Sequence, residues 1–221
     1  MRDVTYLLRV VLPDRPGMLG AVATALGCVG ADIVSLDVVE RGPDGAVDDL
    51  LVQLPPGGLA DALITSAQSV PGVVVESLRP YLGADDLHRD LELVEELAAA
   101  PQDALRLLVD LAPGVFRAGW ALVVGPDGRD GLVGSAGAPA LEGVALSWLP
   151  LGAPCRMGSR EEWVPPRWSD LGIEMAAAPV GSPDRVVLVG RQGGPQFRAS
   201  EVLRLAHLAG ITATVAASVL A

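Results

Sequence analysis

The 221-residue chain is half apolar and has a formal net charge of −11, so it offers no basic face for nucleic acid. All sixteen basic residues are Arg, and without a lysine amine the chain can neither form a Schiff base with pyridoxal phosphate nor complete a Walker phosphate loop. Charged residues interrupt both the longest apolar stretch and the N-terminal segment, so neither a membrane span nor a secretory signal is expected.

The first 82 residues predict a β-α-β-β-α-β succession of elements. Apolar residues alternate over 4–12, and after them they recur at offsets of three, four and seven up to Gly27, which predicts a strand followed by an amphipathic helix. Two alternating segments, 34–38 and 50–54, flank a Gly-Pro-Asp-Gly turn signal, which is typical of a β-hairpin. A second amphipathic helix over 59–70 and a strand over 73–81 complete the series.

The most informative motif is Pro13-Asp14-Arg15-Pro16-Gly17-Met18-Leu19, at the junction between the first strand and the first helix. Pro16 suits the first turn of a helix, and Gly17 lets another group approach the backbone closely. Unpaired N–H groups at a helix N-terminus favour a carboxylate. Fifteen residues beyond Gly17, Ala31-Asp32-Ile33 opens the next strand.

This arrangement resembles the ACT domain, a βαββαβ module that binds amino acids and regulates metabolic enzymes. The resemblance covers about residues 1–82 and implies a ferredoxin-like fold. The family normally has Asn at the position of Asp32 and often at that of Asp14. A pocket with two carboxylates in their place should prefer a cationic group, or even a divalent metal, over a bare carboxylate. In ACT dimers the residue corresponding to Asp32 commonly faces the loop of the partner subunit, so a complete site would use two chains. The implied ligand-binding residues are Leu12, Asp14, Arg15, Gly17, Met18, Leu19, Asp32 and Ile33.

A purely structural role for the two aspartates is the alternative. Asp14 would then cap the helix, and Asp32 would end a turn; both are common uses of Asp.

The second part of the chain predicts helices at both of its ends and antiparallel strands between them. A helical connector is expected over 85–112, and a strand over 120–124 leads into a second Gly-Pro-Asp-Gly turn at 125–128. The segment from 149 to 171 has four Pro, two Trp and no clear period, which predicts a lid or a mobile loop. Further strands are expected near 144–148, 175–180 and 185–190, followed by a long helix from Ser200.

The tail of this part, Arg185 to Gly190 followed by Phe197 and a helix opening with Ser200-Glu201-Val202-Leu203, resembles a GAF domain. The resemblance covers residues 85–221, with the sheet and the C-terminal helix over 118–221. It implies an α/β sensor fold with an antiparallel sheet and terminal helices. Such domains bind small molecules or pair through their terminal helices, which predicts a homodimer.

Three residues of this part are candidates for a second pocket: Cys155, Trp163 and Trp168. Arg156 follows Cys155 and would lower the pKa of its thiol, but no His is adjacent in sequence to act as a base. Trp163 and Trp168 lie in the irregular segment and are pocket or interface candidates, whereas Trp120 and Trp148 are expected in the core. No metal site and no cofactor are predicted.

The two resemblances together predict a cytoplasmic, homodimeric α+β regulatory protein without enzymatic activity. It would bind an amino acid or a related amine in its ACT-like domain and act on an unknown downstream protein. The cytoplasmic setting rests on two cysteines without paired or metal-ligand spacing. Two alternatives stay open: a dimerising adaptor with degenerate pockets, and a thiol enzyme that uses Cys155.

Overall fold

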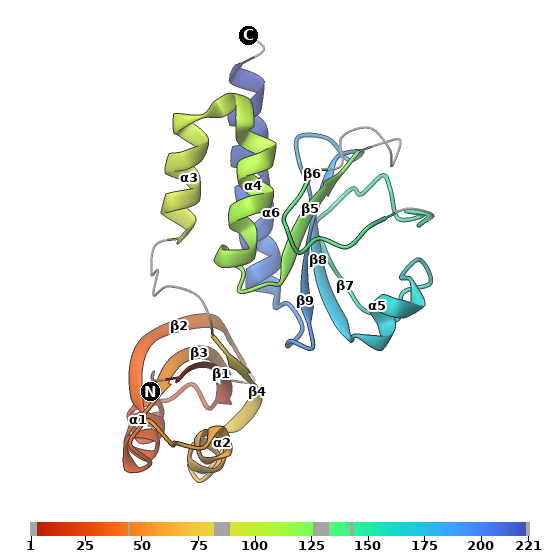
Figure 1. The fold of residues 1–221 in the computed structure, drawn as a ribbon. Helices are drawn as coiled ribbons and strands as arrows, with labels where there is room; N and C mark the ends of the chain where they lie inside the picture. The colour runs from red at the N-terminus through yellow and green to blue at the C-terminus, as the bar shows by residue number, and fades with distance from the viewer. Residues whose placement is uncertain (1–3, 44, 82–88, 126–132, 142–143, 220–221) are drawn as a thin grey trace. The chain divides into compact units, whose positions relative to one another are not determined.

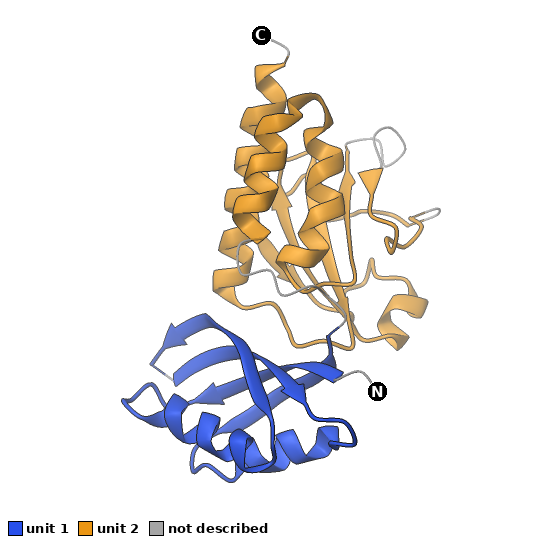
Figure 2. Cartoon of the chain, turned by 60° about the vertical axis from the view of Figure 1, so that its left-hand side comes forward, with its two compact units in different colours: residues 1–87 blue, residues 88–221 orange. Residues whose placement is uncertain are grey.

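The computed structural model describes residues 4–43, 45–81, 89–125, 133–141 and 144–219. The chain divides into two compact units, residues 1–87 and 88–221 (Figure 2). The boundary therefore falls close to the predicted one, in a segment outside the described residues. Each unit has helices and its own antiparallel sheet, so the α+β class is confirmed.

Unit 1 has the predicted order of elements, and its four strands form one antiparallel sheet in the order β2-β3-β1-β4 (Figure 1). The predicted hairpin is present, since Gly42 pairs with Gly45 at the turn between β2 and β3. The elements are β1 (Val4–Leu12), α1 (Met18–Cys28), β2 (Asp32–Gly42), β3 (Gly45–Leu54), α2 (Ala60–Gln68) and β4 (Val74–Pro80).

Both helices of unit 1 cover the same face of its sheet (Figure 1). Strand periodicity explains this, because every second residue of β1 and β3 points toward the helices and most of these residues are apolar. The opposite face of the sheet contains a buried ion pair between Arg9 and Asp49. The buried core on the helix side includes Leu8, Val10, Leu12, Val22, Leu26, Leu50, Val52, Leu54 and Leu63.

Helix α1 begins two residues later than the motif suggests. Pro16 lies in the turn before the helix, and Gly17 precedes the first helical residue with a left-handed backbone, φ 88°. A left-handed residue interrupts the helical conformation, and glycine adopts it without steric cost. The sharp turn therefore depends on Gly17, while Pro16 leads into it.

Unit 2 is built around a five-stranded antiparallel sheet in the order β6-β5-β9-β8-β7. Helices α3, α4 and α6 cover one face of it, and residues from 138–141, 144–151 and 163–168 pack on the other. The predicted connector belongs to this unit, because Leu93 and Leu97 of α3 are fully buried in the core under the helices. The elements are α3 (Arg89–Ala99), a 3₁₀ turn (Pro101–Asp103), α4 (Ala104–Val115), β5 (Trp120–Val124), β6 (Val133–Gly134), β7 (Cys155–Met157), α5 (Pro166–Asp170), β8 (Ile173–Pro179), β9 (Val186–Gln192) and α6 (Ala199–Ser218).

Three predictions for unit 2 need correction. Residues 144–148 do not form a strand: 144–146 have no regular structure, and 147–148 lie in a turn in which the N–H of Leu149 donates to the carbonyl of Leu146. Helix α4 continues through Pro113, because a proline near a helix end removes one hydrogen bond and leaves that of Phe116 to Ala112 intact. The segment 149–171 contains β7 and α5, so it is not wholly irregular. Residues 126–128 of the predicted turn lie outside the described residues.

Tryptophans fill the face of the unit 2 sheet opposite the long helices. Ring centroids are 5.8 Å apart for Trp120 and Trp168, 6.1 Å for Trp168 and Trp163, and 5.4 Å for Trp163 and Trp148. Gly190 makes room for this layer, because a Cβ there would lie 2.1 Å from the Trp120 ring. The layer packs on β5 and β9, and Trp120 and Trp168 are buried in it.

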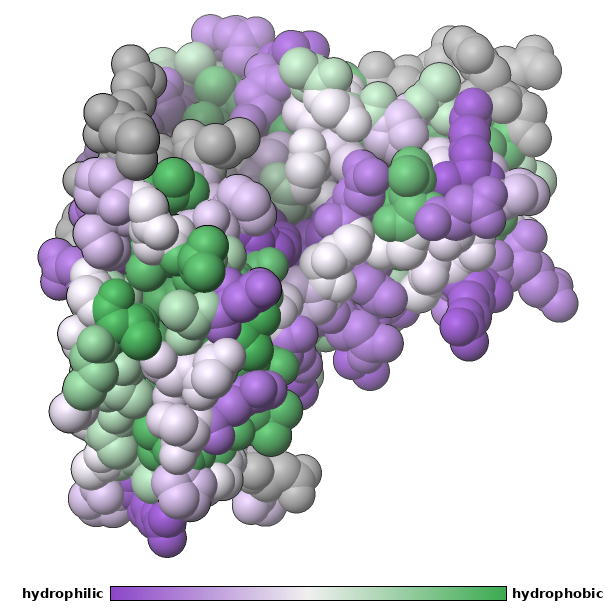
Figure 3. Space-filling model, turned by 60° about the horizontal axis from the view of Figure 1, so that its bottom comes forward, coloured by the Kyte–Doolittle hydropathy of each residue, from purple (hydrophilic) through white to green (hydrophobic). Residues whose placement is uncertain are grey.

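Exposed apolar side chains occur in both units, including Val38 on β2, Leu91 on α3 and Leu203 on α6. The face of the molecule drawn in Figure 3 mixes apolar and hydrophilic residues. Among the described helices, none combines the length and the apolar character needed to cross a membrane.

Candidate functional site

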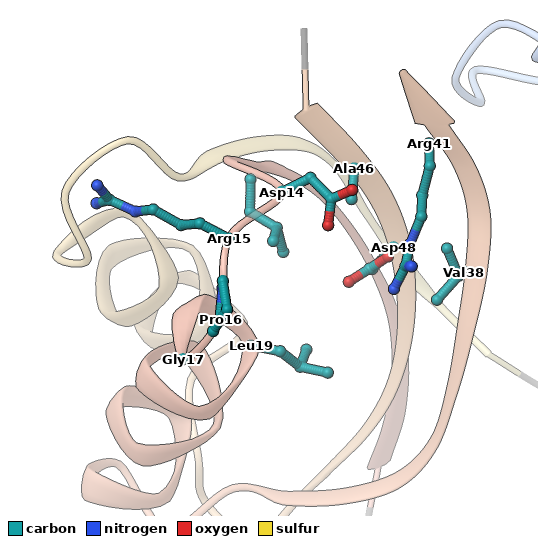
Figure 4. A pocket seen from close by; sticks show the side chains of 10 residues that line it. Asp14, Arg15, Pro16, Gly17, Leu19, Val38, Arg41, Ala46 and Asp48 are labelled. Carbon is teal, nitrogen blue, oxygen red and sulfur yellow. The ribbon is translucent and has the colours of Figure 1, made fainter. Parts of the chain in front are cut away.

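A cavity of about 340 Å³ lies at the N-terminal end of α1 in unit 1 (Figure 4). The end of β1 and the loop before α1 form one side of it, and the β2–β3 hairpin forms the other. The motif at the strand-to-helix junction therefore borders a cavity, as its composition suggests. The lining residues are Leu12, Asp14, Arg15, Pro16, Gly17, Leu19, Val38, Arg41, Ala46 and Asp48.

Backbone N–H groups at the start of α1 form the anion-binding side of this cavity. The first N–H groups of a helix have no carbonyl partner within the helix. Here the N–H of Met18 donates to the carbonyl of Arg15 at 3.3 Å, whereas those of Leu19 and Gly20 find no acceptor among the described residues. Such groups, together with the helix dipole, favour a carboxylate or another anion.

Asp48 is the most unusual residue of the cavity. It is 3% exposed, and its carboxylate points into the cavity (Figure 4). Its Oδ1 atom has no hydrogen-bond partner among the described residues. Burial raises the pKa of the Asp48 carboxyl above its ordinary value; the charges of Asp14 and Asp49 add to the rise, and Arg41 opposes it. A buried acceptor without a donor is costly, which makes this residue a candidate ligand contact.

The other charged residues of the cavity are exposed. Asp14 makes no side-chain cap on α1, and its carboxylate turns toward the same part of the cavity as that of Asp48 (Figure 4). Arg41 extends from β2 toward Asp48 but forms no ion pair with it in the part of the chain described. Arg15 points away from the cavity. The proposed capping role of Asp14 is therefore wrong, and two carboxylates from different elements face into the cavity.

The structure brings five of the predicted binding residues together and separates three from them. Met18 is buried in the core instead of lining the cavity. Asp32 and Ile33 begin β2 and pair with Gln53 and Val52, whereas the cavity adjoins the opposite end of β3 at Ala46. A site combining Asp14 with Asp32 does not form within one chain, because β2 starts at the far end of the sheet. The five that line the cavity are Leu12, Asp14, Arg15, Gly17 and Leu19.

Four lining residues from the β2–β3 hairpin were not predicted from the sequence: Val38, Arg41, Ala46 and Asp48. A signal for Asp48 was present. Leu50, Val52 and Leu54 alternate on the buried face of β3, and the same alternation extended backwards places Asp48 and Ala46 on that face. An Asp in a buried register position is an anomaly that points to a ligand or a partner.

The candidate residues of unit 2 have packing roles in this structure. Burial raises the pKa of the Cys155 thiol, and the charge of Glu161 adds to the rise. Arg156 donates instead to Gln196 Oε1 at 3.3 Å and to the Phe197 carbonyl at 3.5 Å. The expectation that Arg156 lowers the pKa of this thiol is therefore wrong.

The two tryptophans near Cys155 lie in the aromatic layer. Trp168 is 2% exposed in the core, and Trp163 is half-buried beside it. Trp168 therefore fills the core and does not line an open pocket. Within the described residues, no group of His, Cys, Asp and Glu side chains is placed to hold a metal ion.

Comparisons with known proteins give no name to this arrangement. No family model and no curated protein matches the chain. Solved structures do match, among them the crystal structure of an unknown protein from Galdieria sulphuraria. It is 13% identical, the alignment covers 92% of this chain and 90% of that chain, and the TM-score is 0.33. A similarity of this size identifies neither a fold family nor a function.

Proposed function

We propose that the protein is a regulatory protein that senses a small amino compound in the cavity of unit 1. The observation that supports this most directly is Asp48, a buried carboxylate that faces the N-terminus of α1 across a cavity and whose Oδ1 has no donor among the residues that the structure describes. The order of elements in unit 1, which an ACT domain would also have, supports the same assignment.

The cavity suits a zwitterion because it offers both backbone N–H groups and carboxylates. A ligand carboxylate would accept hydrogen bonds from the N–H groups of Leu19 and Gly20, and the helix dipole would favour the negative charge. A ligand ammonium would donate to the carboxylates of Asp14 or Asp48. The volume of about 340 Å³ lies at the lower end of the range for small-molecule sites, which is of order 300–1,000 Å³.

A sensing role is favoured over catalysis by the chemistry of the lining residues. Those described supply carboxylates, guanidinium groups and apolar surface, and none of them is a Ser, Thr, Cys or His. Nucleophilic catalysis uses such a group beside a base, so the lining suits reversible binding better.

We further propose that the protein acts as a homodimer in which α6 contributes to pairing. Leu203 and Ile211 are exposed on this helix at 55% and 38%, although its other face packs in the core of unit 2. They are eight residues apart and therefore lie on the same face of the helix. Light scattering of the purified protein measures the mass in solution and would contradict this if it gave a monomer.

Thermal unfolding of the purified protein against a panel of amino acids, amines, nucleotides and divalent metals tests the sensing role. We expect a specific rise in Tm with one or a few amino compounds, because a ligand that binds only the folded state stabilises it. Asp48→Asn should reduce the rise, and Asp61→Asn, which removes the same charge from α2 outside the cavity, should leave it unchanged. A folded protein that responds to no compound would favour the adaptor alternative.

A further inference from the structure

We infer that the cavity selects a compound with a second cationic group, such as a basic amino acid or a diamine, and that Asp48 is the residue that makes this selection. The inference rests on the proposed function of unit 1 and names the chemical class of its ligand. It follows from the number, the depth and the placement of the charges in the cavity.

The cavity contains two carboxylates, those of Asp14 and Asp48. A neutral amino acid brings one carboxylate and one ammonium. The N–H groups of α1 donate hydrogen bonds to the carboxylate, and one acidic side chain suffices to accept those of the ammonium. Asp14 is adjacent to the start of α1 and exposed, so it is placed for the ammonium that accompanies the bound carboxylate. Asp48 would then remain without a partner.

Asp48 is much more buried than Asp14. At 3% exposure its carboxylate is largely removed from water, and Oδ1 has no donor among the described residues. A neutral ligand side chain would complete the removal of water without supplying a donor, whereas an ammonium or guanidinium would supply both a donor and a positive charge. Hydrogen bonds to charged groups correspond to affinity differences of about tenfold or more.

Apolar side chains form most of the cavity lining apart from the two carboxylates. Asp14 lies in the loop before α1 and Asp48 on β3, on two sides of the cavity (Figure 4). The remaining lining is mainly apolar, which suits the methylene chain between the charged ends of such a ligand. The apolar lining residues are Leu12, Pro16, Leu19, Val38 and Ala46.

Arg41 is the internal competitor for the same carboxylate. Its positive charge opposes the rise in the pKa of Asp48, and its exposed side chain reaches toward that residue from β2 (Figure 4). A cationic ligand group is repelled by this charge. Replacing Arg41 by a neutral side chain should therefore strengthen the binding of a diamine. A diamine has no carboxylate, so the substitution removes a repulsion without removing a favourable contact to the guanidinium.

Isothermal titration at pH 8 of the full chain with lysine and with norleucine tests the inference, because norleucine has the same chain length and lacks the side-chain amine. We expect lysine to bind about tenfold or more tightly than norleucine. Asp48→Asn should reduce this ratio to near one while norleucine binding persists, and Asp61→Asn should preserve it. Arg41→Gln should tighten the binding of 1,4-diaminobutane severalfold.

The outcomes separate this inference from the proposed function. Equal binding of lysine and norleucine would overturn the inference and leave an amino-acid sensor. A lysine preference that survives in Asp48→Asn would overturn the role of Asp48. Binding of none of these compounds to a folded protein would overturn both proposals. Circular dichroism of each variant confirms that it is folded before titration.

Discussion

Asp48 and Asp49 are neighbours on β3, both buried, and yet opposite in their surroundings. On the sheet face away from the helices, Arg9 donates from Nε and Nη2 to the two oxygens of Asp49, at 2.7 and 2.9 Å, and both side chains are 1% exposed. On the helix side, Asp48 Oδ1 has no partner among the described residues and borders a cavity. Among the described residues the chain thus supplies a partner for one buried carboxylate and none for Oδ1 of the other, and we propose that a ligand supplies it.

The largest effect is expected from breaking the Arg9–Asp49 ion pair, on the sheet face away from the helices. Asp49→Ala leaves the Arg9 guanidinium buried with its main acceptor removed, and we expect the free energy of unfolding to fall by about 3–5 kcal/mol. Urea denaturation followed by far-ultraviolet circular dichroism measures this. The double variant Arg9→Met, Asp49→Leu should recover most of the loss, because it removes both charges and retains apolar volume. A loss below about 1 kcal/mol for the single variant would show that the pair contributes as little as a surface ion pair.

Removing the other carboxylate should have the opposite sign. Asp48→Asn takes away a buried charge whose Oδ1 has no donor in the described part of the chain, and we expect the free energy of unfolding at pH 8 to rise by about 1–2 kcal/mol without ligand. The same denaturation experiment measures it. A substitution that stabilises the free protein and weakens ligand binding is the behaviour expected of a binding residue. A decrease in stability comparable to that of Asp49→Ala would mean that Asp48 serves the fold.

The smallest effect is the pH dependence of that stabilisation. Because the pKa of Asp48 is raised in the folded state, the folded protein binds more protons than the unfolded chain between the ordinary value of 3.8 and the raised value. The contribution of Asp48 to stability therefore decreases as pH rises through this window, by at most about 1.4 kcal/mol per pH unit. The difference in Tm between Asp48→Asn and the parent protein should be small near pH 4 and grow toward neutral pH. A difference that is constant with pH would contradict the burial of this charge.

The regular parts of the fold were predictable because their signals are local. Apolar residues alternate along β1 and β3 and recur every three or four residues along α1, and this spacing predicts which side chains face the core. The strand predicted over 144–148 was wrong because it rested on a local signal alone. Its alternating apolar residues pack on the sheet of unit 2, but their backbone forms no strand. A short apolar run shows that residues are buried, but not what their backbone pairs with.

The site was half predictable. The residue types of the loop from Asp14 to Gly17 suit a helix start, so this side of the cavity could be predicted. The partner of this loop across the cavity could not be chosen without the pairing of strands, which places Ala46 beside the end of β1 and Asp32 at the far end. Asp48 could have been noticed from its register, but an Asp in a hairpin is ordinarily exposed, and its burial depends on the packing of α1.

The tryptophan layer of unit 2 has a practical consequence for separating the two units. All four tryptophans of the chain, at positions 120, 148, 163 and 168, belong to residues 88–221, and Trp120 and Trp168 are buried. Unit 1 has none, so selective excitation of indole gives emission from unit 2 alone. A change in that emission during denaturation reports the exposure of the aromatic layer packed over Gly190. The protein thus contains a natural optical probe for one of its two units, against which events in the other can be timed.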